Sequence, residues 1–231
     1  MYILCDPRFA HARHANNNLR MALDATDVEG LLALPPDAPS LTMWVDGSRI
    51  RQGGIAGPSA LQRAPDVVVN TTAMSAKHRA SRRYTLVLVD PDGEYLHFRG
   101  ASYAHWIVTG IRLPKPPKPD ARQPTYAVTA KKGGGARLLK FRAPKFEAGV
   151  HRLVLVLFEE TEKDVRWRKP KKRGGFVLAE FAERHELIPA SATYIVAVAD
   201  EDIDQGAEYF TEEIRKMREE WVKTTEVGWW N

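Results

Sequence analysis

Short apolar runs rich in β-branched residues constrain the fold of this 231-residue chain more than any other feature. Between them lie turns rich in Gly, Pro and Asp, with no regular alternation of strand and helix. A doubly wound fold would show that alternation, so the pattern favours a mostly β domain. The candidate strands are Leu41–Val45, Val67–Val69, Tyr84–Val89, Trp106–Ile111, Leu153–Phe158 and Tyr194–Val198.

Two segments have helical character. Residues 176–187, FVLAEFAERHEL, form a helical stretch that we expect Pro189 to end. Near the C-terminus, apolar residues recur at steps of three and four, which predicts one apolar stripe on an amphipathic helix. The residues of this stripe are Ala207, Phe210, Ile214, Met217 and Trp221.

The two ends of the chain look like appendages to the β domain. The first 20 residues hold three arginines against one acid and lack the apolar core of a secretory signal, so we interpret them as an exposed arm. Trp229 and Trp230 near the C-terminus favour a partner surface. The expected organisation is an N-terminal arm over 1–40, a β domain over 41–206, and a C-terminal helix and tail over 207–231.

Hydropathy and cysteine content limit the cellular setting. No apolar run approaches the roughly 20 residues that a membrane helix needs, so we expect a soluble protein without a membrane span. The single cysteine, Cys5, excludes an internal disulfide and fits a reducing compartment.

Basic charge is gathered in two segments rich in Gly or Pro. Residues 112–145 hold ten Lys or Arg against one Asp, and residues 163–173 hold seven against Asp164 alone. Two such segments are typical of a nucleic-acid footprint, although a solvated basic surface gives the same composition. In the second segment Trp167 lies between cations, a pattern suited to phosphate contacts with stacking on an unpaired base.

The candidate site residues lie beside the apolar runs. Asp90 and Asp92 would share a face if the strand continued through Pro91, and His105 and His151 border neighbouring strands. Two carboxylates and two imidazoles suit a metal ion, acid–base chemistry or an anion pocket, and their spacing leaves all three open. Asp-Pro-Asp is also a common turn. No HExxH, GxSxG, P-loop or Cys/His cluster is present, and we expect neither enzyme activity nor a metal or cofactor.

Four blocks, in order, resemble the phosphatidylethanolamine-binding protein (PEBP) family. They are GPSALQRAPDVVV (57–69), YTLVLVDPDGEYLHFRGASYAHWIVTGI (84–111), GVHRLVLVLFEE (149–160) and RGGFVLAEFAERHELIPASATYIVA (173–197). The resemblance implies a β-sandwich with peripheral helices and a small anion pocket at one end, which a phosphate head group can occupy.

The resemblance also implies which residues line that pocket, and where the chain departs from the family. Tyr103 replaces the usual Trp, and residues 141–143, Phe-Arg-Ala, fill positions that are usually glycine. The acids and imidazoles are kept while the anion-binding loop has changed, so we interpret the pocket as vestigial. Its residues are Asp90, Asp92, Tyr103, His105, Pro144 and His151.

The arm, the basic loops and the C-terminal helix look like a branch of this family found in the large subunit of mitochondrial ribosomes. That resemblance implies a structural protein in the mitochondrial matrix that contacts rRNA and other mitochondrial ribosomal proteins. The alternative is a cytoplasmic regulator that binds phosphatidylethanolamine or a small anionic ligand. The residues expected to contact rRNA are Lys131, Lys132, Arg137, Arg166, Arg168, Lys171, Lys172 and Arg173.

Overall fold

The computed structural model describes seven stretches of the chain, and these carry the β domain. The N-terminal arm, apart from its last two residues, and the predicted C-terminal helix with its Trp-Trp ending lie outside them. The described residues are 39–70, 82–92, 101–113, 125–128, 135–145, 150–161 and 165–198.

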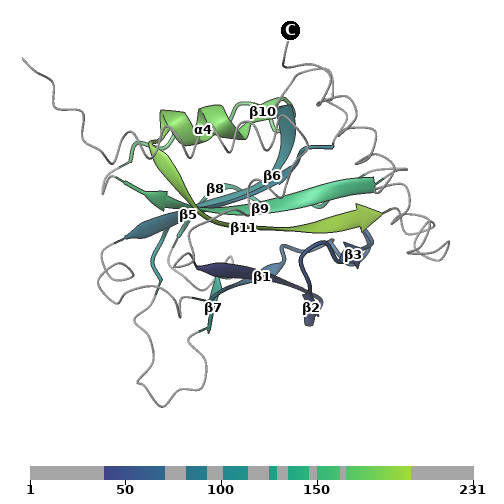
Figure 1. The fold of residues 1–231 in the computed structure, drawn as a ribbon. Helices are drawn as coiled ribbons and strands as arrows, with labels where there is room; N and C mark the ends of the chain where they lie inside the picture. The colour runs from purple at the N-terminus through teal and green to yellow at the C-terminus, as the bar shows by residue number, and fades with distance from the viewer. Residues whose placement is uncertain are drawn as a thin grey trace, which may run out of the picture.

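Two β-sheets pack face to face, and a short helix covers the outer face of the larger one (Figure 1). The predicted mostly β fold is confirmed. The larger sheet has the order β10 (Phe176–Val177), β6 (Ala101–Ile111), β5 (Arg83–Asp90), β9 (Val150–Glu160), β11 (Leu187–Val198) and β3 (Ile55–Ala56), with β8 (Ala136–Leu139) paired to β6. The smaller sheet has the order β2 (Ser48–Ile50), β1 (Ser40–Val45), β4 (Asp66–Asn70) and β7 (Thr125–Val128).

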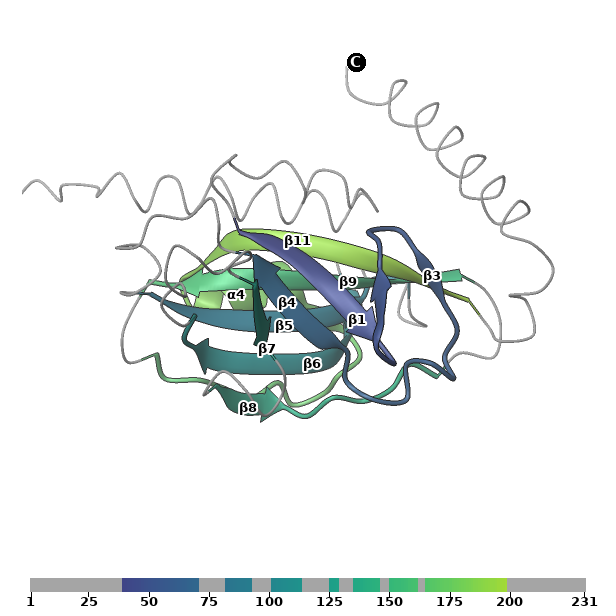
Figure 2. The same ribbon diagram turned by 90° about the horizontal axis from the view of Figure 1, so that it is seen from below.

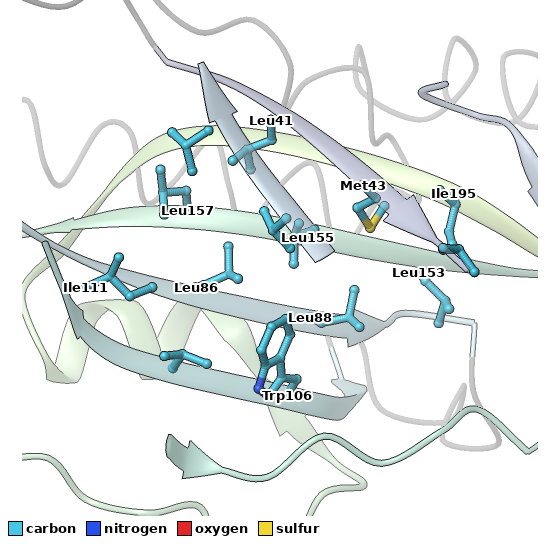
Figure 3. Close-up of a cluster of buried hydrophobic side chains, with 14 of the residues drawn as sticks. Leu41, Met43, Leu86, Leu88, Trp106, Ile111, Leu153, Leu155, Leu157 and Ile195 are labelled. Atoms are coloured by element: carbon cyan, nitrogen blue, oxygen red, sulfur yellow. The ribbon is translucent and has the colours of Figure 1, made fainter. Parts of the chain in front are cut away.

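The main core lies between the two sheets. Alternate residues of the central strands, such as Leu86 and Leu88 of β5 and Leu155 of β9, point into it (Figure 3). Their neighbours Val87 and Val89 face the opposite side, where they pack under the helix α4 (Leu178–Arg184). Because both faces of β5 are covered, this strand is an almost unbroken apolar run with little polar alternation.

The strands predicted from the apolar runs are present, and five others were not among them: β2, β3, β7, β8 and β10. The strand β8 begins one residue before Arg137, inside the first basic segment, residues 112–145. That segment was interpreted as a basic loop, which is wrong for this part of it. Figure 2 shows β8 beside β6 at the margin of the larger sheet. The strand β7 pairs with β4 and was not predicted. Both are four-residue strands with weak apolar character, so the sequence gives no clear signal for them.

The helical stretch predicted for residues 176–187 is shorter than expected. Phe176 and Val177 form the strand β10 against β6, and the helix covers only Leu178–Arg184. Glu186 ends it with a left-handed backbone (φ 52°), and β11 begins at the next residue. Pro189 lies inside β11 at a register shift, where its missing N–H is tolerated, so it does not end the helix.

None of the helices in the described ranges is long and apolar enough to cross a membrane.

Candidate functional site

The candidate site lies where three central strands of the larger sheet end or begin. Because β5 runs antiparallel to both β6 and β9, the end of β5 meets the beginnings of its two neighbours. Asp90 is the last residue of β5, opposite Tyr103 of β6. His151 is the second residue of β9, and His105 follows Tyr103 by two positions. Sheet topology therefore brings these side chains to one edge.

Asp90 is buried and accepts hydrogen bonds at both carboxylate oxygens. The Nδ1–H of His151 donates to Oδ2 over 2.8 Å, and the backbone N–H of Asp92 donates to Oδ1 over 2.8 Å. The first bond joins β9 to β5, and the second closes the turn after β5 in the manner of an Asx turn. Both bonds hold the local structure together without a ligand.

Asp92 pairs with Arg152, a residue that the sequence analysis did not single out. The strand ends at Asp90, so the premise that both acids share a face of a continuing strand is wrong. Asp92 Oδ2 accepts from the backbone N–H of Arg152 over 2.9 Å and from its Nε over 2.6 Å, and Oδ1 accepts from Nη2. The His-Arg pair in the block GVHRLVLVLFEE was the available signal for this partner.

The charge state of Arg152 follows from this pairing. Burial disfavours the charged guanidinium, but the hydrogen bond and the negative charge of Asp92, with that of Asp90, raise the pKa of Arg152 above its ordinary value. The bidentate contact is therefore a permanent ion pair at the edge of the sheet.

His105 is buried and held in one orientation. Its Nδ1–H donates to the carbonyl of Arg142 over 2.8 Å, and the N–H of Arg142 donates back to the His105 carbonyl over 3.0 Å. The ring of Tyr103 lies 4.8 Å from the imidazole, centroid to centroid. His105 Nε2 is buried and has no hydrogen-bond partner among the described residues.

Burial lowers the pKa of His105, and hydrogen bonding to Arg142 and the charge of Asp90 oppose this only in part. The ring is therefore neutral near pH 7. With Nδ1 donating to a carbonyl, the unpartnered Nε2 carries a lone pair and can accept a hydrogen bond from a ligand.

The segment that replaces the family's glycine-rich loop packs inward. Phe141 meets Trp106 edge-on, with ring centroids 6.3 Å apart, and packs against the inter-sheet core. Pro144 is buried two residues beyond Arg142. Because Arg142 uses its N–H and its carbonyl on His105, this backbone is not free to surround an anion as a glycine loop does.

The second basic segment, residues 165–173, keeps its cations exposed apart from Arg173, and its tryptophan is half-buried. Arg166 and Arg168 point to solvent, while Trp167 between them packs on the helix α4. Its ring stacks on Phe181 at 6.3 Å and tilts against His185 at 4.9 Å. The ring therefore anchors the segment to the protein, and the interpretation of Trp167 as a base-stacking residue stays a prediction.

Arg173 differs from the other expected RNA contacts. Its guanidinium donates to the carbonyls of Ala104 (3.0 Å), His105 (2.8 Å) and Lys140 (2.7 Å). Its own carbonyl accepts from the N–H of Ala104 over 2.9 Å. Arg173 thus ties the basic segment to β6 at Ala104 and His105, so its guanidinium is not a free phosphate contact.

The remaining predicted contacts are spread over the chain. Lys171 and Lys172 are exposed in the second basic segment, and Arg137 is exposed on β8. Lys131 and Lys132 lie outside the described residues. Within the described ranges no three His, Cys, Asp or Glu side chains are grouped as a metal site would require.

Comparisons with known proteins support one family. A sequence model described as phosphatidylethanolamine-binding protein matches residues 40–197. The protein FLOWERING LOCUS T of Arabidopsis thaliana is 30% identical over 183 residues, which cover 77% of this chain and 90% of that protein. Protein TWIN SISTER of FT from the same plant is 33% identical over 115 residues, and the match spans about half of its length, 55%.

Solved structures agree with the fold. A carboxypeptidase Y inhibitor, crystallised with its cognate proteinase, superposes with a TM-score of 0.58 over 82% of this chain and 97% of that one, at 14% identity. The phosphatidylethanolamine-binding protein of Plasmodium vivax superposes with a TM-score of 0.55 over 78% and 97%, at 15% identity. At such identities the likeness concerns the fold alone.

Proposed function

The chain belongs to the phosphatidylethanolamine-binding protein family, and from that premise we propose that it is a structural constituent of the mitochondrial large ribosomal subunit. In this proposal the β domain contacts rRNA through exposed cations, and the terminal arms contact neighbouring ribosomal proteins. The observation that carries the proposal is the anchored basic segment. Five exposed cations lie between residues 166 and 172, on a segment tied down at Trp167 and Arg173.

Anchoring matters because a phosphate contact made by a preorganised side chain loses less conformational entropy than one made by a free loop. The rRNA backbone is a dense array of negative charge, and Lys or Arg side chains that neutralise it release counterions. The state of the candidate pocket also supports this proposal. Its acids already pair with His151, Arg152 and the backbone N–H of Asp92, so they need no ligand to be satisfied.

The first test is sedimentation of the tagged full chain from lysed mitochondria of its own organism on sucrose gradients at low and moderate salt. We expect co-migration with the large ribosomal subunit at both salt concentrations. Protein that stays at the top of the gradient would refute the ribosomal assignment.

The second test measures the affinity of the full chain for RNA as a function of salt. Neutralising Arg166, Arg168, Lys171 and Lys172 to Gln should weaken binding and flatten the slope of log K against log salt, by roughly 0.7–0.9 for each lost phosphate contact. The matched control neutralises Arg49, Arg51, Arg63 and Arg112, which are also exposed but belong to other parts of the domain. Equal effects of the two quadruple variants would show that only net charge matters.

One observation favours a second candidate, a regulator that binds a phosphorylated small ligand in the family pocket. His105 Nε2 is a buried acceptor without a partner among the described residues, and a protonated phosphate or an ammonium group would satisfy it. Calorimetric titration with phosphoethanolamine should then show saturable binding that is lost in His105→Ala and His151→Ala. Absence of saturable heat in the unmodified chain would remove this candidate. We propose no catalytic residue.

A further inference from the structure

A cavity of about 390 Å³ lies between the basic segment and the C-terminal end of the helix α4. It is separate from the pocket residues described above, and none of those residues lines it. Its volume falls in the lower part of the range for small-ligand sites. The lining residues are Val165, Arg166, Arg168, Arg184, His185 and Glu186.

Three exposed arginines from two elements line this cavity. Arg166 and Arg168 come from the basic segment, and Arg184 is the last residue of α4. Glu186 is the one carboxylate among the lining residues, so the lining carries a net positive charge. Guanidinium groups bind phosphate oxygens through two parallel N–H donors, which makes arginine well suited to this anion.

His185 supplies the second, independent observation. The residue lines the cavity, is only 5% exposed, and has a buried Nε2 atom without a hydrogen-bond partner among the described residues. A buried imidazole nitrogen with no partner costs free energy unless a ligand or water satisfies it. The Trp167 and Phe181 rings pack against the imidazole, with ring centroids at 4.9 Å and 4.8 Å from it, so its position is fixed.

Electrostatics favour an anion at the same place. Burial lowers the pKa of His185, and the positive charges of Arg184 and Arg168 lower it further. Like charges gathered around a neutral, partly desolvated imidazole repel one another, and a bound anion would relieve that repulsion.

We propose that this cavity is a phosphate-binding site, in which Arg166, Arg168 and Arg184 hold the phosphate oxygens beside the buried imidazole of His185. The site is distinct from the family's anion pocket and does not depend on the ribosomal assignment. Its ligand is a phosphate ester, supplied by a small phosphorylated molecule or by the backbone of RNA. The anchoring of Trp167 explains how two neighbouring arginines are presented to one ligand.

The test follows the imidazole signals of the full chain by NMR while inorganic phosphate is added at constant ionic strength. The His185 signal is assigned with His185→Gln. We expect a saturable shift and a rise in the pKa of His185, because a bound anion stabilises the imidazolium. No saturable shift of His185 would overturn the proposal.

Two variants with the same loss of charge sharpen the test. Arg184→Gln should weaken phosphate binding about tenfold or more, since hydrogen bonds to charged groups are among the stronger polar contacts. Lys169→Gln removes an exposed cation of the same segment that does not line the cavity, and should change affinity less than about twofold. Equal losses of phosphate affinity in the two variants would show general charge attraction only, and would overturn the proposed site.

A second arm replaces inorganic phosphate with an RNA oligonucleotide. The same His185 shift, lost in Arg184→Gln, supports the site and identifies RNA as the phosphate source. A response to inorganic phosphate alone supports the site with a small phosphate ester as its ligand. In that second case RNA binding through the exposed cations, measured separately, still decides the ribosomal proposal.

Discussion

At the scale of single residues, several polar side chains that look functional in the sequence hold the fold together. The charge of Asp92 is neutralised by Arg152, and Asp90 links His151 to the turn after β5. The guanidinium of Arg173 donates hydrogen bonds to three backbone carbonyls. The contacts of Asp92 with Arg152, of Asp90 with His151 and of Arg173 with His105 join positions about 60 or more residues apart, so each can stabilise tertiary contacts between strands or between a strand and the basic segment.

Arg173→Lys should lower the free energy of unfolding by about 1–3 kcal/mol, because one ammonium group cannot reach the three carbonyls that the guanidinium spans. Arg166→Lys is the matched control, since Arg166 is exposed, and it should stay within about 0.5 kcal/mol of the unmodified protein. Urea denaturation measures both. Equal stability of the two variants would argue against the structural role of Arg173.

His185→Phe should make stability less dependent on pH. Burial lowers the pKa of His185 below its ordinary value of 6.5, so as pH falls below 6.5 the unfolded chain takes up the proton first. The folded state therefore loses stability over that interval. Phenylalanine fits the same aromatic surroundings and cannot titrate, so we expect a slope smaller by at most about 1.4 kcal/mol per pH unit.

Chemical denaturation between pH 7.5 and 5 measures this slope. His105, whose pKa burial also lowers, keeps a slope of the same sign in the variant. A His185→Phe variant with the slope of the unmodified protein would contradict the assigned cause.

At the scale of elements, Trp167 and Arg173 hold the basic segment in position. Trp167 packs against the helix α4, while the cations on either side remain in solvent. The segment has no strand or helix hydrogen bonds of its own, so side-chain anchors supply the order that a regular element would have.

Trp167→Ala should cost about 1–3 kcal/mol of stability, less than a fully buried Trp because the ring is only partly covered. Hydrogen exchange of the amides from 165 to 172 should become faster, since the segment loses its contact with α4. Trp44→Ala on β1, where the ring is 36% exposed, is the control and should leave exchange in the segment unchanged. Exchange rates unaffected by Trp167→Ala would show that the segment is held by other contacts.

At the scale of the whole molecule, the larger sheet is shared by two cores. One face packs on the smaller sheet and the other packs on α4, so residues next to each other in β9 belong to different cores. Because the same strands serve both, the two layers should unfold together.

Leu155→Ala, in the core between the sheets, and Phe158→Ala, in the core under α4, should each cost about 2–5 kcal/mol. Circular dichroism and tryptophan fluorescence should report the same transition midpoint in both variants. Separate midpoints for the two probes would show that the layers unfold independently. Ile55→Ala, at a site that is 38% exposed, is a control with a small expected effect.

How much the sequence reveals depends on the range of the interactions involved. The strands β5, β6 and β9 are predictable because buried strands in a covered sheet are apolar on both faces, and that signal is local. The strands β7 and β8 could not be predicted from the sequence, since a four-residue strand has too few positions to show a period of two. The first residue of α4 also could not be predicted, because Phe176 and Val177 suit a strand or a helix equally until a partner strand is present.

For the candidate site, family motifs in the amino-acid sequence were enough to locate Asp90, His105 and His151, because these motifs are short and contiguous. Their bonding partners depend on which strands lie side by side, and that depends on sheet order and register, which no local pattern encodes. The same holds for Trp167: its place between cations suggested RNA stacking, and only the structure shows that it packs against a helix more than ten residues away. Composition and motifs therefore establish family and fold class, whereas packing between distant segments separates anchoring residues from those left free to bind.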